Sequence, residues 1–224
     1  MSGPHLHLDV YPDAEAACRA AAQRLAQALR EGGTAALAGG STPRPAYRML
    51  AGMDLPWRAL TVLPTDERCV PPDHPDRNDR MLAEALGDRG YRLVRLPAEL
   101  GPEAGARRAE AQVAPLLPFR VVLLGLGEDG HTASLFPGHP ALQATGWVAP
   151  VRRAPKPPPE RISLTLRALS HTETALLLVT GAAKRDALHQ LMTGADVPPR
   201  RLTVPHLTIL ADREATEPTA LTLP

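Results

Sequence analysis

Short apolar runs alternate along this chain with segments in which apolar residues recur at helical spacing. Runs of aliphatic and β-branched residues predict buried strands, and segments with a period near 3.6 residues predict helices. Such alternation is typical of an α/β protein with a mostly parallel sheet and helices on both faces. The expected strands are His5–Tyr11, Thr34–Ala38, Leu60–Leu63, Arg92–Leu96, Arg120–Leu124, Ile162–Leu166, Ala175–Thr180 and Leu202–Leu210, with a further apolar segment at Trp147–Val151. The expected helices are Asp13–Arg30, 43–50, Asn78–Leu86, Glu103–Leu116 and Ala183–Met192.

The sequence contains no internal repeat and no linker that would separate two domains. A proline-rich stretch at 155–159 lies between expected strands, and we interpret it as a stiff loop within one unit. The chain has 224 residues, 44% of them hydrophobic and 22% charged, which is enough to bury a substantial core. We therefore predict a single domain over residues 1–224.

The charge of the chain restricts its partners. A net charge of +1 provides no overall basic surface for nucleic acid or for an anionic membrane. No apolar stretch reaches the roughly 18 residues of a membrane span, and the first residues lack the basic and apolar regions of a secretory leader. We predict a cytoplasmic protein that binds neither nucleic acid nor membrane, and the sequence leaves open a monomer or a small homo-oligomer.

The cysteine, histidine and lysine residues add three observations. Cys18 and Cys69 belong to no C-x-x-C motif, and the eight histidines show no metal-ligand spacing, so neither a disulfide nor a metal site is expected. Of 25 basic residues, only Lys156 and Lys184 are lysine. Because the other basic residues of this chain are all arginine, a lysine here is a small indication of a functional residue.

The segment Val121–Pro137 is the most informative part of the sequence. A buried strand ends there in glycines, acidic residues, a histidine and two hydroxyl residues. Parallel sheets place their binding sites in loops of this kind, at the carboxyl ends of the strands. We predict that His131 is a general base with Asp129 close to it, although a lone loop histidine often only fills space.

The same segment also matches the dinucleotide-binding pattern G-x-G-x-x-G at Gly125–Gly130. That fingerprint requires a helix starting at the third glycine and an acidic residue about 20 residues later. Pro137 leaves too little room for such a helix, and positions 145–152 contain no acid. The sequence therefore disfavours a nicotinamide nucleotide, and we expect no cofactor.

A second candidate loop, Gly39–Pro43, follows the expected strand Thr34–Ala38. The backbone amide of Gly40, the hydroxyls of Ser41 and Thr42, and the helix N-terminus that follows form a potential phosphate cradle. The loop lacks the G-K-[ST] ending of a Walker A motif, and an ordinary helix cap is the plain alternative.

Two further loops carry charge. In the long loop 65–78, Asp66, Glu67 and Arg68 directly follow a strand and are predicted to contact a polar ligand. Its prolines predict a loop that is ordered but not buried. Lys156 and Arg161 flank the proline run and are placed to close on an anion. Together with the histidine loop, these groups suit a sugar phosphate.

Five segments of the chain, in order, resemble the signature segments of the 6-phosphogluconolactonase family, and the similarity extends from about residue 5 to residue 212. The most specific is the sequence DGHTASLFP at Asp129–Pro137. The resemblance implies a Rossmann-like α/β fold shared with glucosamine-6-phosphate deaminases and ribose-5-phosphate isomerases. The segments are Ala38–Pro43, Thr65–Pro71, Leu124–Pro137, Lys156–Leu166 and Val179–Lys184.

Two positions depart from the family pattern. Arg77 stands where a serine usually precedes Asn78, and we expect it to alter the charge of the cleft. The last expected strand, within Leu202–Asp212, lacks a tryptophan that is often present. Neither departure falls within the signature motifs.

The resemblance implies hydrolysis of 6-phospho-D-glucono-1,5-lactone to 6-phosphogluconate, a step of the oxidative pentose phosphate pathway, with no metal or cofactor. His131 would take a proton from water and return it to the leaving ring oxygen, while Asp129 or Asp66 orients its ring. The sequence does not choose between these acids. The predicted phosphate ligands are Gly40, Ser41, Thr42, Arg68, Lys156 and Arg161, unless one arginine stabilises the oxyanion instead.

Two alternatives share the fold. A deaminase/isomerase for amino-sugar phosphates usually continues the D-G-H motif with an acid that assists ring opening, but Thr132–Pro137 contains none. A sugar-phosphate-sensing effector domain would use the same pocket without turnover. Repressors of that kind carry a helix-turn-helix, whereas residues 1–34 hold only one expected strand and one helix.

Overall fold

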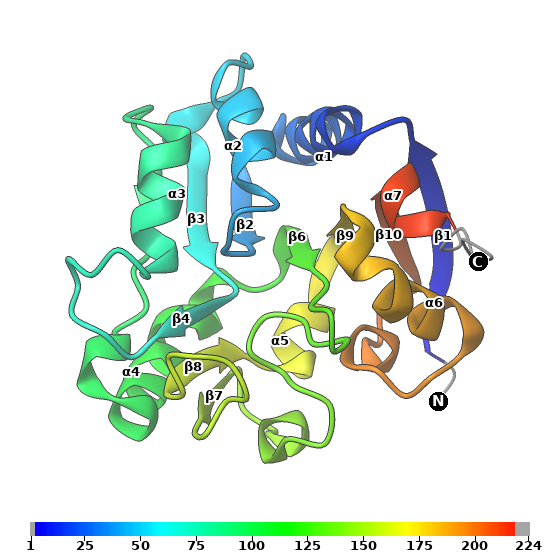
Figure 1. Cartoon of the computed structure of the whole chain (residues 1–224). Helices are drawn as coiled ribbons and strands as arrows, with labels where there is room; N and C mark the ends of the chain where they lie inside the picture. The colour runs from blue at the N-terminus through cyan, green and yellow to red at the C-terminus, as the bar shows by residue number, and fades with distance from the viewer. Residues whose placement is uncertain (1–2, 218–224) are drawn as a thin grey trace.

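The structure, a computed structural model, describes residues 3–217 and is built on a seven-stranded parallel sheet (Figure 1). Its strand order is β1-β10-β9-β6-β2-β3-β5, and all neighbouring strands run parallel. The prediction of a mostly parallel sheet is confirmed. The strands are β1 (His5–Tyr11), β2 (Gly33–Leu37), β3 (Leu60–Pro64), β5 (Arg92–Leu93), β6 (Phe119–Gly125), β9 (Thr172–Val179) and β10 (His206–Asp212).

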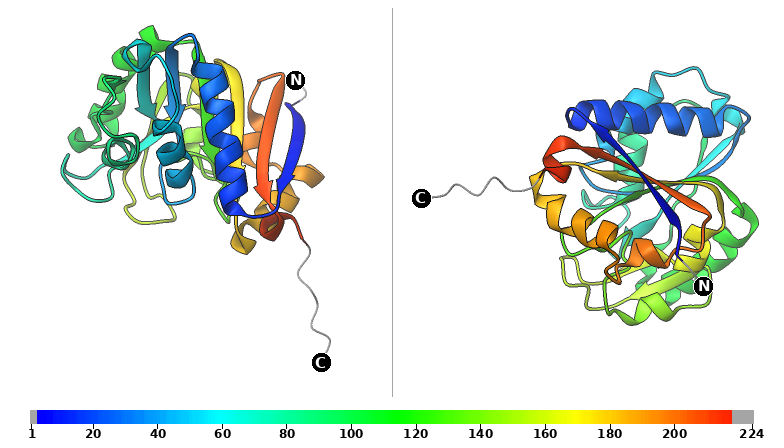
Figure 2. Two further views of the ribbon diagram at one scale, coloured as in Figure 1. Left: turned by 90° about the horizontal axis from the view of Figure 1, so that it is seen from above. Right: turned by 90° about the vertical axis from the view of Figure 1, so that its right-hand side faces the viewer.

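Helices cover both faces of this sheet, as the sequence predicts. On one face α1, α2 and α3 pack against strand residues that include Val121 and Leu123, and on the other α4, α5 and α6 pack over Val122 and Leu124. Successive residues of a buried strand point to opposite faces, so a continuous apolar run supplies both cores. Figure 2 shows α1 and α6 on opposite sides of the sheet. The helices are α1 (Ala14–Leu29), α2 (Arg44–Ala51), α3 (Asn78–Leu86), α4 (Pro102–Val113), α5 (Leu166–Ser170), α6 (Arg185–Thr193) and α7 (Arg213–Thr216).

A small antiparallel sheet packs beside the large one. It contains β4 (Asp66–Arg68), β8 (Arg161–Leu164) and β7 (Val148–Val151), in that order. Ile162 and Leu164 are fully buried in the same hydrophobic cluster as Val122 and Leu124 of the large sheet. Because the two sheets share one core, the described residues form a single α/β domain.

This small sheet corrects two predictions. Residues 65–78 were expected to form an unburied loop, but 66–68 is the strand β4, and Asp66 and Glu67 are buried. The predicted strand Ile162–Leu166 ends earlier, because Thr165 caps the helix α5: its hydroxyl oxygen accepts a hydrogen bond from the main-chain N–H of Ala168 (3.1 Å). The charged sequence of β4 gives no apolar alternation from which a strand is predicted.

The topology determines where a ligand site can form. After β2 the chain passes through α2 and forms the next strand, β3, on the side of β2 that faces away from β6. After β6 the next strand of the large sheet, β9, forms on the side of β6 that faces away from β2. The carboxyl ends of the adjacent strands β2 and β6 therefore mark a topological switch point, where α/β proteins bind ligands. Within residues 3–217, no helix is long and apolar enough to cross a membrane.

Candidate active site

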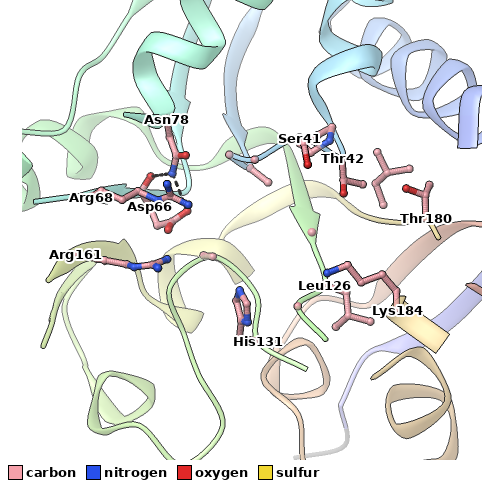
Figure 3. A pocket seen from close by; sticks show the side chains of 18 residues that line it. Ser41, Thr42, Asp66, Arg68, Asn78, Leu126, His131, Arg161, Thr180 and Lys184 are labelled. Carbon is pink, nitrogen blue, oxygen red and sulfur yellow. Dashed lines mark hydrogen bonds between the residues drawn. The ribbon is translucent and has the colours of Figure 1, made fainter. Parts of the chain in front are cut away.

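A polar pocket lies at the switch point, between loops that follow β2, β3, β6 and β9 (Figure 3). The structure brings most of the predicted site residues together there. Asp129, Glu67 and Lys156 are not among the side chains that line the pocket. The predicted residues that line it are Gly40, Ser41, Thr42, Asp66, Arg68, His131 and Arg161.

The glycine loop after β2 forms one wall of the pocket. Gly40 has φ of +97°, a conformation that favours glycine, and nothing lies within 4 Å of where its Cβ would be. At Gly39, a Cβ would lie 1.9 Å from Oδ1 of Asn78, so only glycine lets this amide pack against the loop. The chain then enters α2 through Pro43, and the Ser41 and Thr42 side chains line the pocket near the helix N-terminus.

His131 and Asp129 form a hydrogen-bonded pair on the loop after β6. Oδ1 of Asp129 accepts from Nδ1 of His131 and from its main-chain N–H (3.2 Å). A carboxylate at Nδ1 keeps that nitrogen protonated, which leaves the Nε2 lone pair free to act as a base. Burial lowers the pKa of His131 below its usual 6.5, although Asp129 opposes that shift. This shift favours the neutral form of the imidazole.

Asp66 makes a different set of contacts. Its Oδ2 accepts from the Ser134 hydroxyl (2.5 Å), and its main-chain oxygen accepts from Nδ2 of Asn78 (2.8 Å). No hydrogen bond among the described residues joins Asp66 to His131. The sequence leaves open whether Asp129 or Asp66 contacts the ring of His131, and in the structure Asp129 makes this contact.

Glu67 lies behind the pocket wall rather than in it. Its fully buried carboxylate accepts from the main-chain N–H groups of Arg68 (2.9 Å), Asn78 (2.8 Å) and Asp79 (2.8 Å). Burial raises the pKa of Glu67 to about 7, although these N–H groups and the nearby Arg77 oppose the shift. Since this carboxylate ties β4 to the N-terminus of α3, the predicted contact with a ligand does not fit its placement.

Arg77 is also turned away from the pocket, so the expected change of cleft charge is wrong. Its side chain is 1% exposed, with Nη2 2.7 Å from Oδ2 of Asp79 and Nη1 3.2 Å from Oε2 of Glu99. Nη2 also donates to the main-chain oxygen of Leu96 (3.0 Å). The positive charge of the guanidinium is balanced by these carboxylates within a buried cluster, where the side chain contributes to packing.

Three cationic side chains line the pocket, those of Arg68, Arg161 and Lys184, and Lys156 lies near them. Arg161 donates through Nη2 to the main-chain oxygens of Lys156 (2.9 Å) and Pro157 (3.1 Å), which fastens the proline turn. Nη1 of Arg68 donates to the main-chain oxygen of Asp76 (3.0 Å). Lys156 lies close enough to lower the pKa of Lys184, although burial is the larger cause of that shift.

Lys184 lines the pocket and was not among the predicted site residues. Its Nζ lies 3.9 Å from Oε1 of the exposed Glu128, which is a weak pairing. Two signals in the sequence pointed to it, since it is one of two lysines and ends a segment with family resemblance. Figure 3 shows Lys184, Ser41 and Thr42 on one side of the pocket, facing Arg68 and Arg161 on the other.

The glycine-rich loop does not continue as a dinucleotide-binding fold would. No helix follows Gly130, because residues 132–135 form a tight turn closed by a bridge between Thr132 and Leu135. Gly130 has φ of +82°, and a Cβ there would lie 2.8 Å from Cγ1 of Val197. This glycine instead lets the backbone turn sharply between Asp129 and His131.

Replacement of Gly130 by alanine is expected to lower kcat by roughly tenfold, because a shift of His131 from its working position is costly. The positive φ and the contact with Val197 force such a shift, and strain of this kind costs about 1–2 kcal/mol of stability. Steady-state kinetics of the variant, with thermal unfolding measured in parallel, checks this expectation.

Gly138→Ala is the matched control, since φ there is +73° but nothing lies within 4 Å of the added Cβ. It should lose similar stability and keep its kcat. A fully active Gly130→Ala variant, or micromolar binding of NADP to the wild-type protein by calorimetry, would contradict our interpretation of this loop.

Fold and pocket together define a class: an α/β protein with a cation-rich pocket and a carboxylate-paired histidine at the switch point of a parallel sheet. The family model described as glucosamine-6-phosphate isomerases/6-phosphogluconolactonase matches residues 12–214. This chain belongs to that family.

Curated relatives show the same similarity. A 6-phosphogluconolactonase of Caulobacter vibrioides is 41% identical over 170 residues, which cover 68% of this chain and 71% of the relative. The 6-phosphogluconolactonase of Synechocystis is 36% identical over 87% of this chain and 88% of its own length. That of Mycobacterium leprae is 37% identical over 84% of this chain and 86% of its own.

Solved structures agree with the fold. The 6-phosphogluconolactonase of Trypanosoma cruzi has 26% identity and a TM-score of 0.84, over all of this chain and 99% of its own. That of Trypanosoma brucei has 26% identity and a TM-score of 0.81, over 96% and 98%. A monomeric glucosamine-6-phosphate deaminase, at 23% identity and a TM-score of 0.81 over 93% and 98%, shares the fold.

Proposed function

We propose that this protein hydrolyses 6-phospho-D-glucono-1,5-lactone to 6-phosphogluconate in the oxidative pentose phosphate pathway. The observation that carries the proposal is the pairing of His131 with Asp129, which leaves Nε2 free at the edge of a cation-rich pocket. Family membership supports the substrate class, since curated relatives with 34–41% identity are named 6-phosphogluconolactonase.

In the proposed reaction, Nε2 of His131 takes a proton from water while the water oxygen bonds to the lactone carbonyl carbon. The resulting tetrahedral oxyanion collapses, the bond from that carbon to the ring oxygen breaks, and the imidazolium returns its proton to the leaving oxygen. The product carboxylic acid then releases a proton to solvent. Asp129 holds the required tautomer and stabilises the transient imidazolium.

We assign the 6-phosphate to the cradle formed by Gly40, Ser41 and Thr42, with Lys184 beside it. Arg68 and Arg161 remain proposed anion ligands from the facing side, and Lys156 from above. Burial lowers the pKa of both Arg161 and Lys184, so their positive charges are incompletely compensated in this pocket. A phosphate dianion would compensate them.

Single alanine replacements of these cations are expected to raise KM for the phosphorylated lactone by about 10- to 150-fold, with kcat little changed. That range corresponds to roughly 1.5–3 kcal/mol for a charge-assisted hydrogen bond. Each variant should be assayed on 6-phosphogluconolactone and on unphosphorylated gluconolactone. The variants are Arg68→Ala, Lys156→Ala, Arg161→Ala and Lys184→Ala.

The ratio of kcat/KM for the two lactones separates the possible roles. A phosphate ligand loses discrimination between them, whereas a residue that stabilises the oxyanion loses kcat on both. Arg80→Ala is the matched control, because Arg80 is exposed on α3 and bonds at the surface to Glu84 and to the main-chain oxygen of Asp73. If a variant discriminates between the phosphorylated and unphosphorylated lactones as well as the wild-type protein does, the replaced residue is not a phosphate ligand.

The overall proposal is tested by pH-stat titration with freshly generated 6-phosphogluconolactone, after subtraction of spontaneous hydrolysis. We expect acid release well above background. Ammonia release from glucosamine 6-phosphate would instead indicate a deaminase, and sugar-phosphate binding without turnover on either substrate would indicate an effector domain.

The proposal extends to organisation and partners. We propose that residues 1–224 form one lactonase domain, which acts in the cytoplasm as a monomer or small homo-oligomer without cofactor, metal or nucleic acid. The net charge of +1 supports the last point. Light scattering coupled to gel filtration measures the oligomeric state.

A further inference from the structure

The chain contains two phenylalanines, and one of them lies against the candidate base. Phe136 is 1% exposed, and the centroid of its ring is 4.5 Å from that of the His131 imidazole, at an interplanar angle of 37°. Cζ of Arg161 lies 5.7 Å from the same ring centroid. Phe136 thus contacts both a candidate catalytic base and a pocket cation.

The local backbone explains why these two rings meet. Thr132 and Leu135 form an antiparallel bridge, in which the N–H of each donates to the carbonyl oxygen of the other (3.3 and 2.9 Å). His131 and Phe136 are the next residues outward on either side of that bridge, so their side chains are neighbours. The hydroxyl of Thr132 donates to the main-chain oxygen of Gly125 (2.8 Å), which fixes the turn to the end of β6.

We propose that Phe136 is a positioning residue for His131: its ring fixes the plane of the imidazole against Asp129 and excludes water from one side of it. The proposal rests on the proposed function, because it assumes that His131 is the base. It assigns the apolar ring a role beyond core packing, since the ring covers one side of the imidazole without adding a charge or a hydrogen bond.

The electrostatics of the site agree with this role. Burial is the largest cause of the lowered pKa of His131, and Phe136 is a fully buried group in contact with that ring. The charged groups that act on the imidazole are Asp129, Asp66 and Lys156, and Phe136 leaves their charges unchanged. The face of an aromatic ring also attracts an imidazolium, and this attraction raises the pKa of the histidine instead of lowering it. The proposal requires that exclusion of water outweighs it.

The test is an NMR titration of the histidine Cε1–H signals in the wild-type protein and in Phe136→Leu. Loss of one signal in His131→Ala assigns the resonance. We expect the pKa of His131 to rise by roughly 0.5 in Phe136→Leu, toward its usual value, because water reaches the imidazole. If Phe136→Leu does not fold, Phe136→Met, which keeps more of the volume, replaces it.

Phe119→Leu is the matched control, because Phe119 is fully buried like Phe136, whereas the ring contact with His131 is made by Phe136. It should lose similar stability and leave the pKa of His131 unchanged. In kinetics, Phe136→Leu should lower kcat roughly tenfold with KM unchanged and move the acid limb of kcat/KM to higher pH. Phe119→Leu should change neither.

An unchanged or lower pKa of His131 in Phe136→Leu, or an equal shift in Phe119→Leu, would overturn the proposal. The titration requires no turnover, so it stands apart from the lactonase assay. If wild-type protein does not hydrolyse the lactone, the proposed function fails while the titration still reports whether the ring controls His131.

Discussion

Replacement of His131 by alanine should lower kcat for 6-phosphogluconolactone by about 10²–10⁴, the usual contribution of a positioned general base. KM should change little, because the imidazole lies on the loop after β6 while the proposed phosphate ligands Ser41, Thr42 and Lys184 come from other loops. The measurement is initial-rate kinetics by pH-stat, corrected for spontaneous hydrolysis, which sets the floor for the residual rate.

His189→Ala serves as the control, since His189 is exposed on α6 and does not line the pocket. It should keep wild-type kcat and KM. If His131→Ala instead retains kcat and only raises KM, then His131 binds the substrate without acting on it, and the general base must be sought elsewhere in the pocket.

The parallel sheet could be predicted because its signal is local. Buried strands such as β6 and β9 carry uninterrupted apolar runs, since both of their faces are covered, and glycine or acidic residues end them abruptly. Loops at the carboxyl ends of adjacent strands must lie near one another. The gathering of Ser41, Thr42, Asp66, Arg68 and His131 around one pocket follows from that geometry.

The small sheet and the role of Glu67 could not be predicted, because both depend on distant partners. Three charged residues form β4 only because β8, about 95 residues later, supplies the opposite strand. Glu67 is buried because the N-terminus of α3 presents N–H groups that need an acceptor. A sequence shows that an acid follows a strand, but not whether it faces the ligand or the backbone.

Arg77 and Phe136 illustrate the same limit. Whether an arginine faces a cleft or a buried set of carboxylates depends on where Asp79 and Glu99 lie in space. The contact of Phe136 with His131 depends on a four-residue turn in which Ala133 adopts φ of +49°. Such a conformation is uncommon for alanine and has no clear sequence signal.

The replacement Asp129→Asn tests whether Asp129 acts by orienting the His131 ring and selecting its tautomer, or only through its negative charge. We expect kcat to fall by about 10²–10⁴, because an asparagine amide can donate to Nδ1 and so favour the tautomer in which Nε2 carries the proton. Size and shape are conserved, so KM should change little. Kinetics over a range of pH checks both expectations.

The pH dependence gives a second readout with a definite sign. The Asp129 charge raises the pKa of His131, so removing it lowers that pKa further below 6.5. A base is inactive when protonated, so the acid limb of kcat/KM should move to lower pH while the plateau falls. Loss of rate through simple misfolding would lower the plateau without moving the limb.

Asp66→Asn provides the comparison, because Asp66 also acts on His131 through its charge but makes no hydrogen bond to it. Its acid limb should move less, since Asp66 is the smaller influence on that pKa. A larger shift in Asp66→Asn than in Asp129→Asn, or an acid limb in Asp129→Asn that stays in place, would contradict the orienting role of Asp129. Equal effects of the two variants would mean that charge alone matters, because only Asp129 contacts Nδ1 and can select the tautomer.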